Sequence, residues 1–323
     1  MRIRSIVEAI KIEQTSSPYD SLHLKIFYPS NTQDAEMGRF PVDSQQAPYK
    51  IVILFNGINC DPQQYQWLAI QLAKQGLIVV TFAWVCQNIP GIVAISPGVD
   101  LKLLTPKTYG SGATASALPT LLTALERFQT QSILAGCLDL QQIIIGGHSA
   151  GGRVAIESAN PEFFPQIVAA FAYGAHTAAG SQLGYASGTI LPLPDSLPLL
   201  LIGGSCDGVI ANNGHHYGVN WEYPITPIQR TFEEAIVGGR KDSYLLLLEG
   251  ANHFTITHPL DTTLGTTDLD YPATQPEDQL RNIMAEMITL FIQAHVCHQP
   301  QALNILNQYL ETKNPLIATF ERK

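Results

Sequence analysis

Apolar residues in this chain form short uninterrupted runs that alternate with stretches of helical spacing. Uninterrupted apolar runs of about four to eight residues are typical of strands buried on both faces. They predict strands at 50–55, 77–82, 142–145, 167–173, 197–202 and 244–248. Apolar residues at helical spacing predict helices at 65–75, 113–134, 153–158, 227–237, 275–296 and 301–310. This alternation predicts an α/β fold with a mainly parallel central sheet and helices on both faces.

Two early segments have a different pattern, because apolar and polar residues alternate along 3–12 and 22–28. Such alternation is typical of half-buried strands, so we expect an antiparallel pair at the edge of the sheet. No linker separates two cores, and we therefore expect a single domain over residues 1–323, with a helical extension at about 298–323. Its helix either packs on the domain or mediates a homodimer, and the sequence leaves both open.

A glycine-rich turn carries the most informative chemistry. The sequence Gly-Gly-His-Ser-Ala-Gly-Gly occupies residues 146–152, between a predicted strand and a predicted helix. Gly-x-Ser-x-Gly in this context is a nucleophile elbow, in which glycines without a Cβ let strand and helix approach closely. The helix N-terminus directs free N–H groups toward a developing oxyanion. Ser149 is therefore a candidate nucleophile, and the alternative is a glycine-rich turn with an inert serine.

A serine nucleophile needs a base, and the base needs an orienting group. Asp207 follows the predicted strand 197–202, and His253 follows the predicted strand 244–248. Carboxyl ends of parallel strands meet at one edge of the sheet, and the order Ser149, Asp207, His253 is the one expected for an elbow of this kind. We expect His253 to act as the base and Asp207 to orient it. The alternatives are a turn-capping role for Asp207 and a surface position for His253.

Two backbone N–H groups are needed to stabilise an oxyanion. Ala150 directly follows Ser149, and Ile58 lies in the loop after the predicted strand 50–55, so their N–H groups are the candidates. An ordinary glycine turn is the alternative at Ile58. The aromatic segment 208–224 either lines a substrate pocket or packs on the sheet, and 258–276 is a candidate lid or pocket rim. The predicted pocket residues are Asn59, Tyr217, Trp221 and Phe254.

Composition limits the classes of partner. Charged residues make up 14% of the 323 residues, the formal net charge is −9, and Lys and Arg do not cluster. We therefore expect no nucleic-acid partner and, without a long apolar stretch, no stable membrane insertion.

The N-terminal residues lack the apolar core of a signal peptide, and five scattered cysteines fit reduced thiols, which together predict a cytoplasmic protein. His215 and His216 match no zinc spacing, so no metal is expected.

Several of these motifs resemble those of the α/β-hydrolase superfamily. The resemblance rests on residues 147–152, Asp207 and the sequence Gly-Ala-Asn-His-Phe at 250–254, and it covers roughly residues 1–297. The Gly-His-Ser-x-Gly-Gly motif is similar to the branch that holds dienelactone-hydrolase-like proteins, chlorophyllases, cutinase-like polyester hydrolases and platelet-activating-factor acetylhydrolases. The resemblance implies the α/β-hydrolase fold and serine-dependent hydrolysis of carboxylic esters without a cofactor.

The chain also departs from these families. Asn56 and Gly57 stand where many members carry His-Gly or Pro-Gly. Ser149 replaces the cysteine of the dienelactone hydrolases proper, and Ala150 replaces the arginine typical of chlorophyllases. The departures concern the branch and leave the superfamily motifs in place.

The expected function is hydrolysis of a small-molecule carboxylic ester through an acyl-enzyme. Few charged residues neighbour the motifs, so we expect an apolar moiety in the substrate. One alternative is an acyltransferase or thioesterase that uses the same three residues. A second alternative is a non-catalytic binding protein of this fold, although a binding role does not require all three groups.

Overall fold

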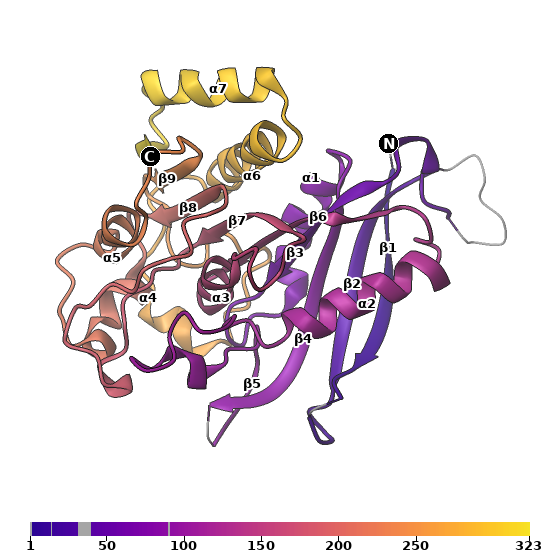
Figure 1. The fold of residues 1–323 in the computed structure, drawn as a ribbon. Helices are drawn as coiled ribbons and strands as arrows, with labels where there is room; N and C mark the ends of the chain where they lie inside the picture. Colours follow the sequence, from indigo (N-terminus) through magenta and orange to yellow (C-terminus); the bar gives the residue numbers. More distant parts are fainter. Residues whose placement is uncertain (1, 14, 32–39, 90) are drawn as a thin grey trace.

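One ten-stranded sheet runs through the computed structural model, which describes residues 2–13, 15–31, 40–89 and 91–323 (Figure 1). Its order is β1-β2-β4-β3-β6-β7-β8-β9-β10, and β5 pairs with β4. The strands are β1 (Arg2–Lys11), β2 (Ser21–Ser30), β3 (Tyr49–Phe55), β4 (Ile78–Ile89), β5 (Ile92–Ile95), β6 (Leu138–His148), β7 (Ile167–Tyr173), β8 (Leu199–Gly204), β9 (Ser243–Leu248) and β10 (Ile317–Arg322). The central strands β4, β3, β6, β7, β8 and β9 are parallel. The predicted α/β class, its mainly parallel sheet and its antiparallel N-terminal pair are confirmed.

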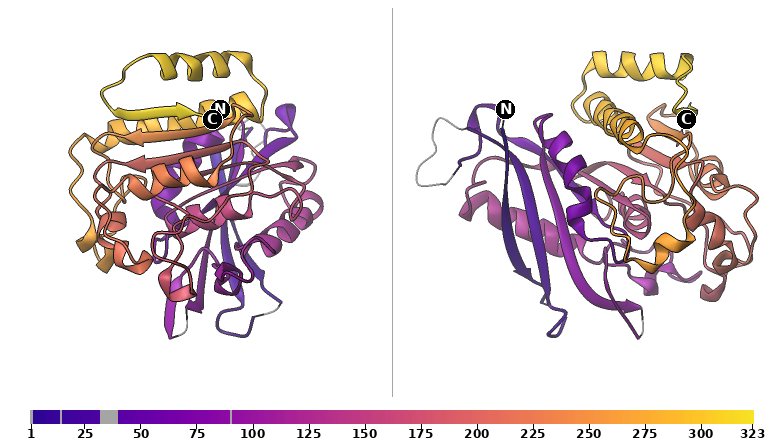
Figure 2. Two further views of the ribbon diagram at one scale, coloured as in Figure 1. Left: turned by 60° about the vertical axis from the view of Figure 1, so that its left-hand side comes forward. Right: turned by 180° about the vertical axis from the view of Figure 1, so that it is seen from behind.

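Helices cover both faces of the sheet, as expected (Figure 2). They are α1 (Gln66–Ala73), α2 (Leu118–Gln131), α3 (Ala150–Ser158), α4 (Gly208–Asn212), α5 (Thr226–Arg230), α6 (Glu277–His295) and α7 (Pro300–Glu311). In β3, Ile51 and Ile53 belong to the core beneath α2 and α3, whereas Val52 and Leu54 belong to the core beneath α1 and α6. This follows from the alternation of side chains along a strand, and it explains why the buried strands are apolar throughout.

The strand order reverses at β3, which lies between β4 and β6. In open sheets with parallel strands, a crevice forms outside the carboxyl ends of the strands at such a point. The loop after β3 contains Ile58, and β6 leads directly into Ser149 and α3. Asp207 and His253 follow β8 and β9 at the same edge of the sheet. The topology therefore gathers these four positions, although they are far apart in sequence.

The structure corrects two of the expected elements. No helix or strand is predicted over residues 84–112, but β4 extends to Ile89 and pairs with β5 as a hairpin. The C-terminal extension was expected to be helical, but α7 is followed by β10, which pairs antiparallel with β9. The Phe320 ring stacks on Tyr244 at 5.6 Å, and β10 covers what would otherwise be an open sheet edge. A strand of this kind is defined by its distant partner, which local pattern does not reveal.

The helices α6 and α7 pack against each other, and Tyr309 of α7 donates a hydrogen bond to Glu286 of α6 at 2.9 Å. Leu306 of α7 is buried in the core that also holds α6. Of the two roles left open for this helix, packing on the domain is therefore the one seen in the structure.

Candidate active site

Ser149 occupies a sharp turn between β6 and α3, and its backbone has φ 54° and ψ −125°. Positive φ is costly for a residue other than glycine and persists only where the surroundings enforce it. Here the Ser149 N–H donates to the Tyr173 carbonyl at 2.9 Å, and the Ser149 carbonyl accepts the Arg153 N–H at 2.9 Å. A Cβ added to Gly151 would lie 2.4 Å from the carbonyl oxygen of Asn56, so only glycine fits at this crossing.

The imidazole of His253 is held by Asp207, and both side chains are buried, with exposed fractions of 3% and 0% for the two residues. His253 Nδ1 lies 2.8 Å from Asp207 Oδ2 and 3.0 Å from Oδ1. Asp207 Oδ1 also accepts the Ile210 N–H at 2.9 Å, which caps α4. The capping role and the orienting role, weighed as alternatives for Asp207, are thus both present in one carboxylate. When a neutral His253 carries its proton on Nδ1, toward Asp207, its other ring nitrogen, Nε2, can accept a proton.

Neighbouring charges set the pKa of His253. Burial alone would lower this pKa, but the charge and the hydrogen bond of Asp207, together with the charge of Asp270, raise it above the ordinary histidine value. A base must be unprotonated to act. A reaction that depends on His253 as a base is therefore lost as the pH falls through this raised pKa.

His148, the residue before Ser149, is also buried in this site. Its ring centroid lies 4.6 Å from that of His253, and its Nδ1 lies 2.9 Å from Tyr65 Oη. Burial, and then the neighbouring His253, hold the pKa of His148 well below its usual value, so the ring is neutral. Tyr65 Oη accepts the Gly57 N–H at 3.1 Å and can therefore donate its own proton to His148. Tyr65 thus connects the loop after β3 to the elbow.

Replacing Tyr65 with phenylalanine should reduce kcat about tenfold to hundredfold with little change in KM, because Gly57, next to Ile58 with its predicted oxyanion donor, loses its anchor. The Gly57 N–H and His148 Nδ1 would be left unpaired, which should also cost about 1–3 kcal/mol of stability. Steady-state kinetics and thermal unfolding test both. Tyr309→Phe on α7 is the matched control and should be neutral. A Tyr65→Phe variant with unchanged kcat would contradict this role.

The two expected oxyanion donors, the N–H groups of Ile58 and Ala150, come from residues that line the same cavity as Ser149 and His253. Ala150 is the first residue of α3, so its N–H has no partner within the helix. The Ile58 N–H donates to no residue that the structure describes. The Ser149 hydroxyl likewise makes no hydrogen bond to the described residues. In unliganded sites, catalytic hydrogen bonds often tighten only when substrate binds.

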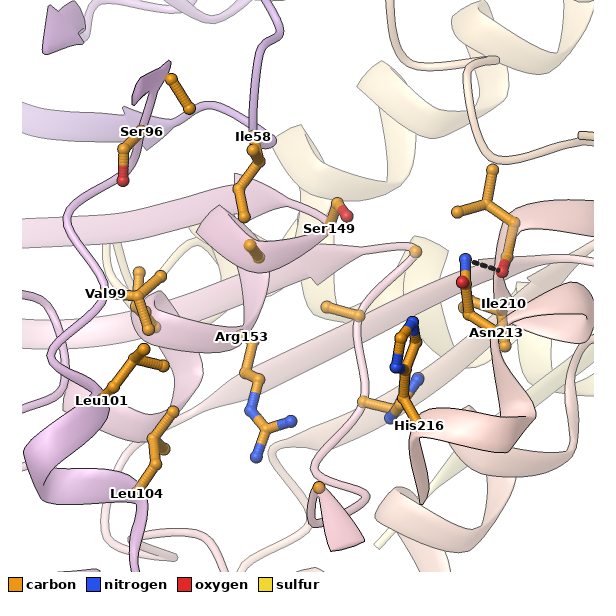
Figure 3. Close-up of a pocket in the computed structure, with 18 of the residues that line it drawn as sticks. Ile58, Ser96, Val99, Leu101, Leu104, Ser149, Arg153, Ile210, Asn213 and His216 are labelled. Atoms are coloured by element: carbon orange, nitrogen blue, oxygen red, sulfur yellow. Dashed lines mark hydrogen bonds between the residues drawn. The ribbon is translucent and has the colours of Figure 1, made fainter. Parts of the chain in front are cut away.

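The cavity has a volume of about 430 Å³ and a largely apolar wall. In Figure 3, Val99, Leu101 and Leu104 form one side, Ile210 and His216 lie on the other, and Arg153 lies between them. Pockets of this size and character accommodate small apolar ligands with a few polar groups.

The charge of Arg153 on the cavity wall is compensated. Its Nε donates to Glu157 Oε1 at 2.9 Å, and its Nη1 donates to the Ala178 carbonyl at 2.8 Å. His176 also lines the cavity, and burial, followed by the charge of Arg153, lowers the pKa of His176 to about 3. His176 is therefore neutral. Arg153 is charge-paired with Glu157, but its buried Nη2 makes no hydrogen bond to the described residues, so one donor of Arg153 stays unpaired.

Of the four predicted pocket residues, Tyr217 lines the cavity. Trp221 is buried in the core, and Phe254 packs against the rings of His148 and His253. Asn59 Oδ1 accepts the Ile95 N–H at 3.2 Å and so fixes β5 rather than facing the cavity. The segment 208–224 therefore has both of its expected roles, since Tyr217 borders the cavity while Trp221 packs inward. None of residues 258–276 lines the cavity, contrary to the expected rim.

Sequence reasoning missed four parts of the wall: the β4–β5 hairpin, the loop 96–104, α3 at Arg153 and Val154, and the segment 174–183. Ile92 and Ala94 of β5 line the cavity. The short apolar run at 92–95 is the sequence signal for this strand. Arg153 lies four residues after Ser149 and thus on the same side of α3, which places it next to the nucleophile position.

Three further findings concern the described residues alone. The five cysteines form no disulfide bond, and Cys60, Cys86 and Cys137 are buried. Within the described ranges, no three His, Cys, Asp or Glu side chains are grouped so that they could hold a metal ion. No helix in the part of the chain that the structure describes has the length and apolar character needed to cross a membrane.

No protein-family model matches the chain, and no curated protein matches it significantly. Ser149, which has a strained backbone, and His253, which is paired with buried Asp207, border one largely apolar cavity. Ile58 and Ala150, whose N–H groups are the expected donors, border it too. Such a set of groups can activate a hydroxyl and stabilise an oxyanion.

Proposed function

We propose that this protein is a serine hydrolase of the α/β-hydrolase superfamily that cleaves carboxylic esters. The observation that carries the proposal is the arrangement of Ser149 and His253. Ser149 has a strained backbone at the tip of a strand–turn–helix elbow, and it borders the same cavity as His253, whose Nδ1 is held by buried Asp207. The sheet order, with its reversal at β3 and its antiparallel N-terminal strands, supports the superfamily assignment.

In the proposed reaction, Ser149 Oγ attacks the ester carbonyl carbon while His253 Nε2 takes the serine proton. The N–H groups of Ile58 and Ala150 stabilise the negative oxygen of the tetrahedral intermediate. The C–O bond to the alcohol then breaks, and His253 returns the proton to the leaving oxygen. Water attacks the acyl-enzyme with His253 again as base, which releases the acid and restores the serine. Asp207 stabilises the charged imidazole in both halves of the reaction.

The character of the cavity supports an uncharged, partly apolar substrate. Its wall is mostly aliphatic, Arg153 is paired with Glu157, and His176 is neutral. Burying an uncompensated substrate charge against such a wall would be costly, whereas each buried methylene contributes about 0.8 kcal/mol.

Fluorophosphonate labelling followed by peptide mapping tests the proposal, with turnover of p-nitrophenyl esters from acetate to palmitate measured alongside. We expect a single label on Ser149. We also expect a rate that rises from acetate and falls again once the acyl chain outgrows the cavity of about 430 Å³. Folded protein that takes no label and turns over none of the esters would refute the proposal. A preference for charged esters would refute the substrate class alone.

A further inference from the structure

The carboxylate of Asp270 lies outside the cavity and joins the two loops that carry Asp207 and His253. Its Oδ1 accepts the N–H of Gly208 at 2.8 Å and that of His253 at 3.3 Å. Its Oδ2 accepts the N–H of Phe254 at 3.2 Å. Gly208 directly follows Asp207, so one side chain contacts the backbone of the proposed base and the backbone next to its orienting acid.

The segment around Asp270 packs closely on both loops. Asn212 Nδ2 donates to the Leu269 carbonyl at 2.8 Å, and Asn252 Nδ2 donates to the Tyr271 carbonyl at 2.8 Å. A Cβ added to Gly208 would lie 2.4 Å from the Tyr271 nitrogen. The residue before Asp270 is thus bonded to the segment after β8, and the residue after Asp270 is bonded to the loop after β9. Asp270 itself contacts both.

We propose that Asp270 is a positioning residue that fixes the Asp207–His253 pair, and that residues 269–271 serve as a brace for this pair. The proposal rests on the proposed function. The loops after β8 and β9 are joined before the pair by the Cys206 N–H, which donates to the Ala251 carbonyl at 2.8 Å. After the pair, at Gly208 and Phe254, Asp270 joins them. Misplacement of catalytic groups by about 1 Å can cost about a hundredfold in rate, so a brace at this point has a large effect.

The charge of Asp270 affects the pKa of His253, which gives a second and independent test of the positioning role. It adds to that of Asp207 in raising the pKa of His253. Burial, and then the charge of Asp207, raise the pKa of Asp270 itself, whereas His253 and the backbone N–H groups lower it. Removing the charge of Asp270 should therefore lower the pKa of His253, which an effect on folding alone would not do.

Asp270→Asn tests the proposal. Both carboxylate oxygens of Asp270 accept backbone N–H groups, whereas asparagine has one accepting oxygen and an NH₂ group that cannot accept. We expect kcat to fall about tenfold to hundredfold, with KM within about twofold of wild type, since Asp270 does not line the cavity. We also expect the acidic limb of the kcat/KM profile to move to lower pH. Asp268→Asn, at an exposed carboxylate of the same turn, is the matched control and should match wild type.

NMR titration of the His253 imidazole, in wild type and Asp270→Asn, gives a readout that needs no turnover. A lowered pKa supports the proposal even if Ser149 proves unreactive, so failure of the proposed function is distinguishable. Unchanged kcat and unchanged His253 titration in a labelled, active enzyme would overturn the role of Asp270 and leave the hydrolase assignment standing. If Asp270→Asn does not fold, amide exchange of wild type decides, since rapid exchange at Gly208, His253 and Phe254 would overturn the brace.

Discussion

Replacing Ser149 with alanine is expected to lower kcat for p-nitrophenyl esters by about 10⁴- to 10⁶-fold and to abolish fluorophosphonate labelling. The variant loses the only atom proposed to bond to the carbonyl carbon, and the remaining groups offer only binding and oxyanion stabilisation. Single-turnover and steady-state kinetics measure the loss, and intact-mass spectrometry measures the labelling.

The structure indicates that this variant folds. Alanine keeps the Cβ, and no hydrogen bond of the Ser149 hydroxyl to the described residues is lost. Ser132→Ala, at a hydroxyl beside the end of α2 that donates to the Phe128 carbonyl at 2.8 Å, is the control and should keep its activity and label. Ser149→Ala with activity within about tenfold of wild type would exclude the nucleophile and favour a water-based reaction or a different serine.

The sequence revealed those parts of the fold in which the physical cause is local. A strand buried on both faces must be apolar along its whole length, so β3 and β9 stand out in the chain. The elbow also has a local cause, because β6 and α3 approach so closely that a Cβ added to Gly147 would lie 2.6 Å from the Gly151 carbonyl carbon. The helix α2 begins at Leu118 rather than at residue 113 as predicted, because the ring of Pro119 fits only in the first turn of a helix.

Parts of the site with distant causes escaped prediction. The edge strand β10 depends on pairing with β9, about 70 residues earlier in the chain. Asp270 lies in a polar segment without periodicity, and its partners at Gly208 and Phe254 come from two other loops. The aromatic character of Trp221 predicts a pocket position, yet Trp221 lies in the core. Aromatic side chains bury large areas and therefore stabilise a core equally well.

Asp207→Asn is expected to lower kcat by about 10⁴-fold while leaving the fold intact. Oδ1 of the wild-type carboxylate accepts the Ile210 N–H, whereas Oδ2 makes the shorter contact, 2.8 Å, to His253 Nδ1. An asparagine that keeps its oxygen on Ile210 turns its NH₂ group toward His253 Nδ1. That nitrogen must then act as an acceptor, so the ring proton moves to Nε2 and His253 cannot take the serine proton.

Asp207→Asn also separates two roles of this side chain: the effect of its charge on the pKa of His253 and the capping of α4. Without the charge of Asp207, burial dominates and the pKa of His253 falls, so the acidic limb of the residual activity should move to lower pH. Thermal unfolding should show little loss, since the cap on α4 persists. Asp61→Asn, which keeps an acceptor for the Gln63 N–H at another helix start, is the control and should behave as wild type. Full activity of Asp207→Asn would mean that His253 is oriented without this carboxylate, and a large loss of stability would mean that the cap is the main role of Asp207.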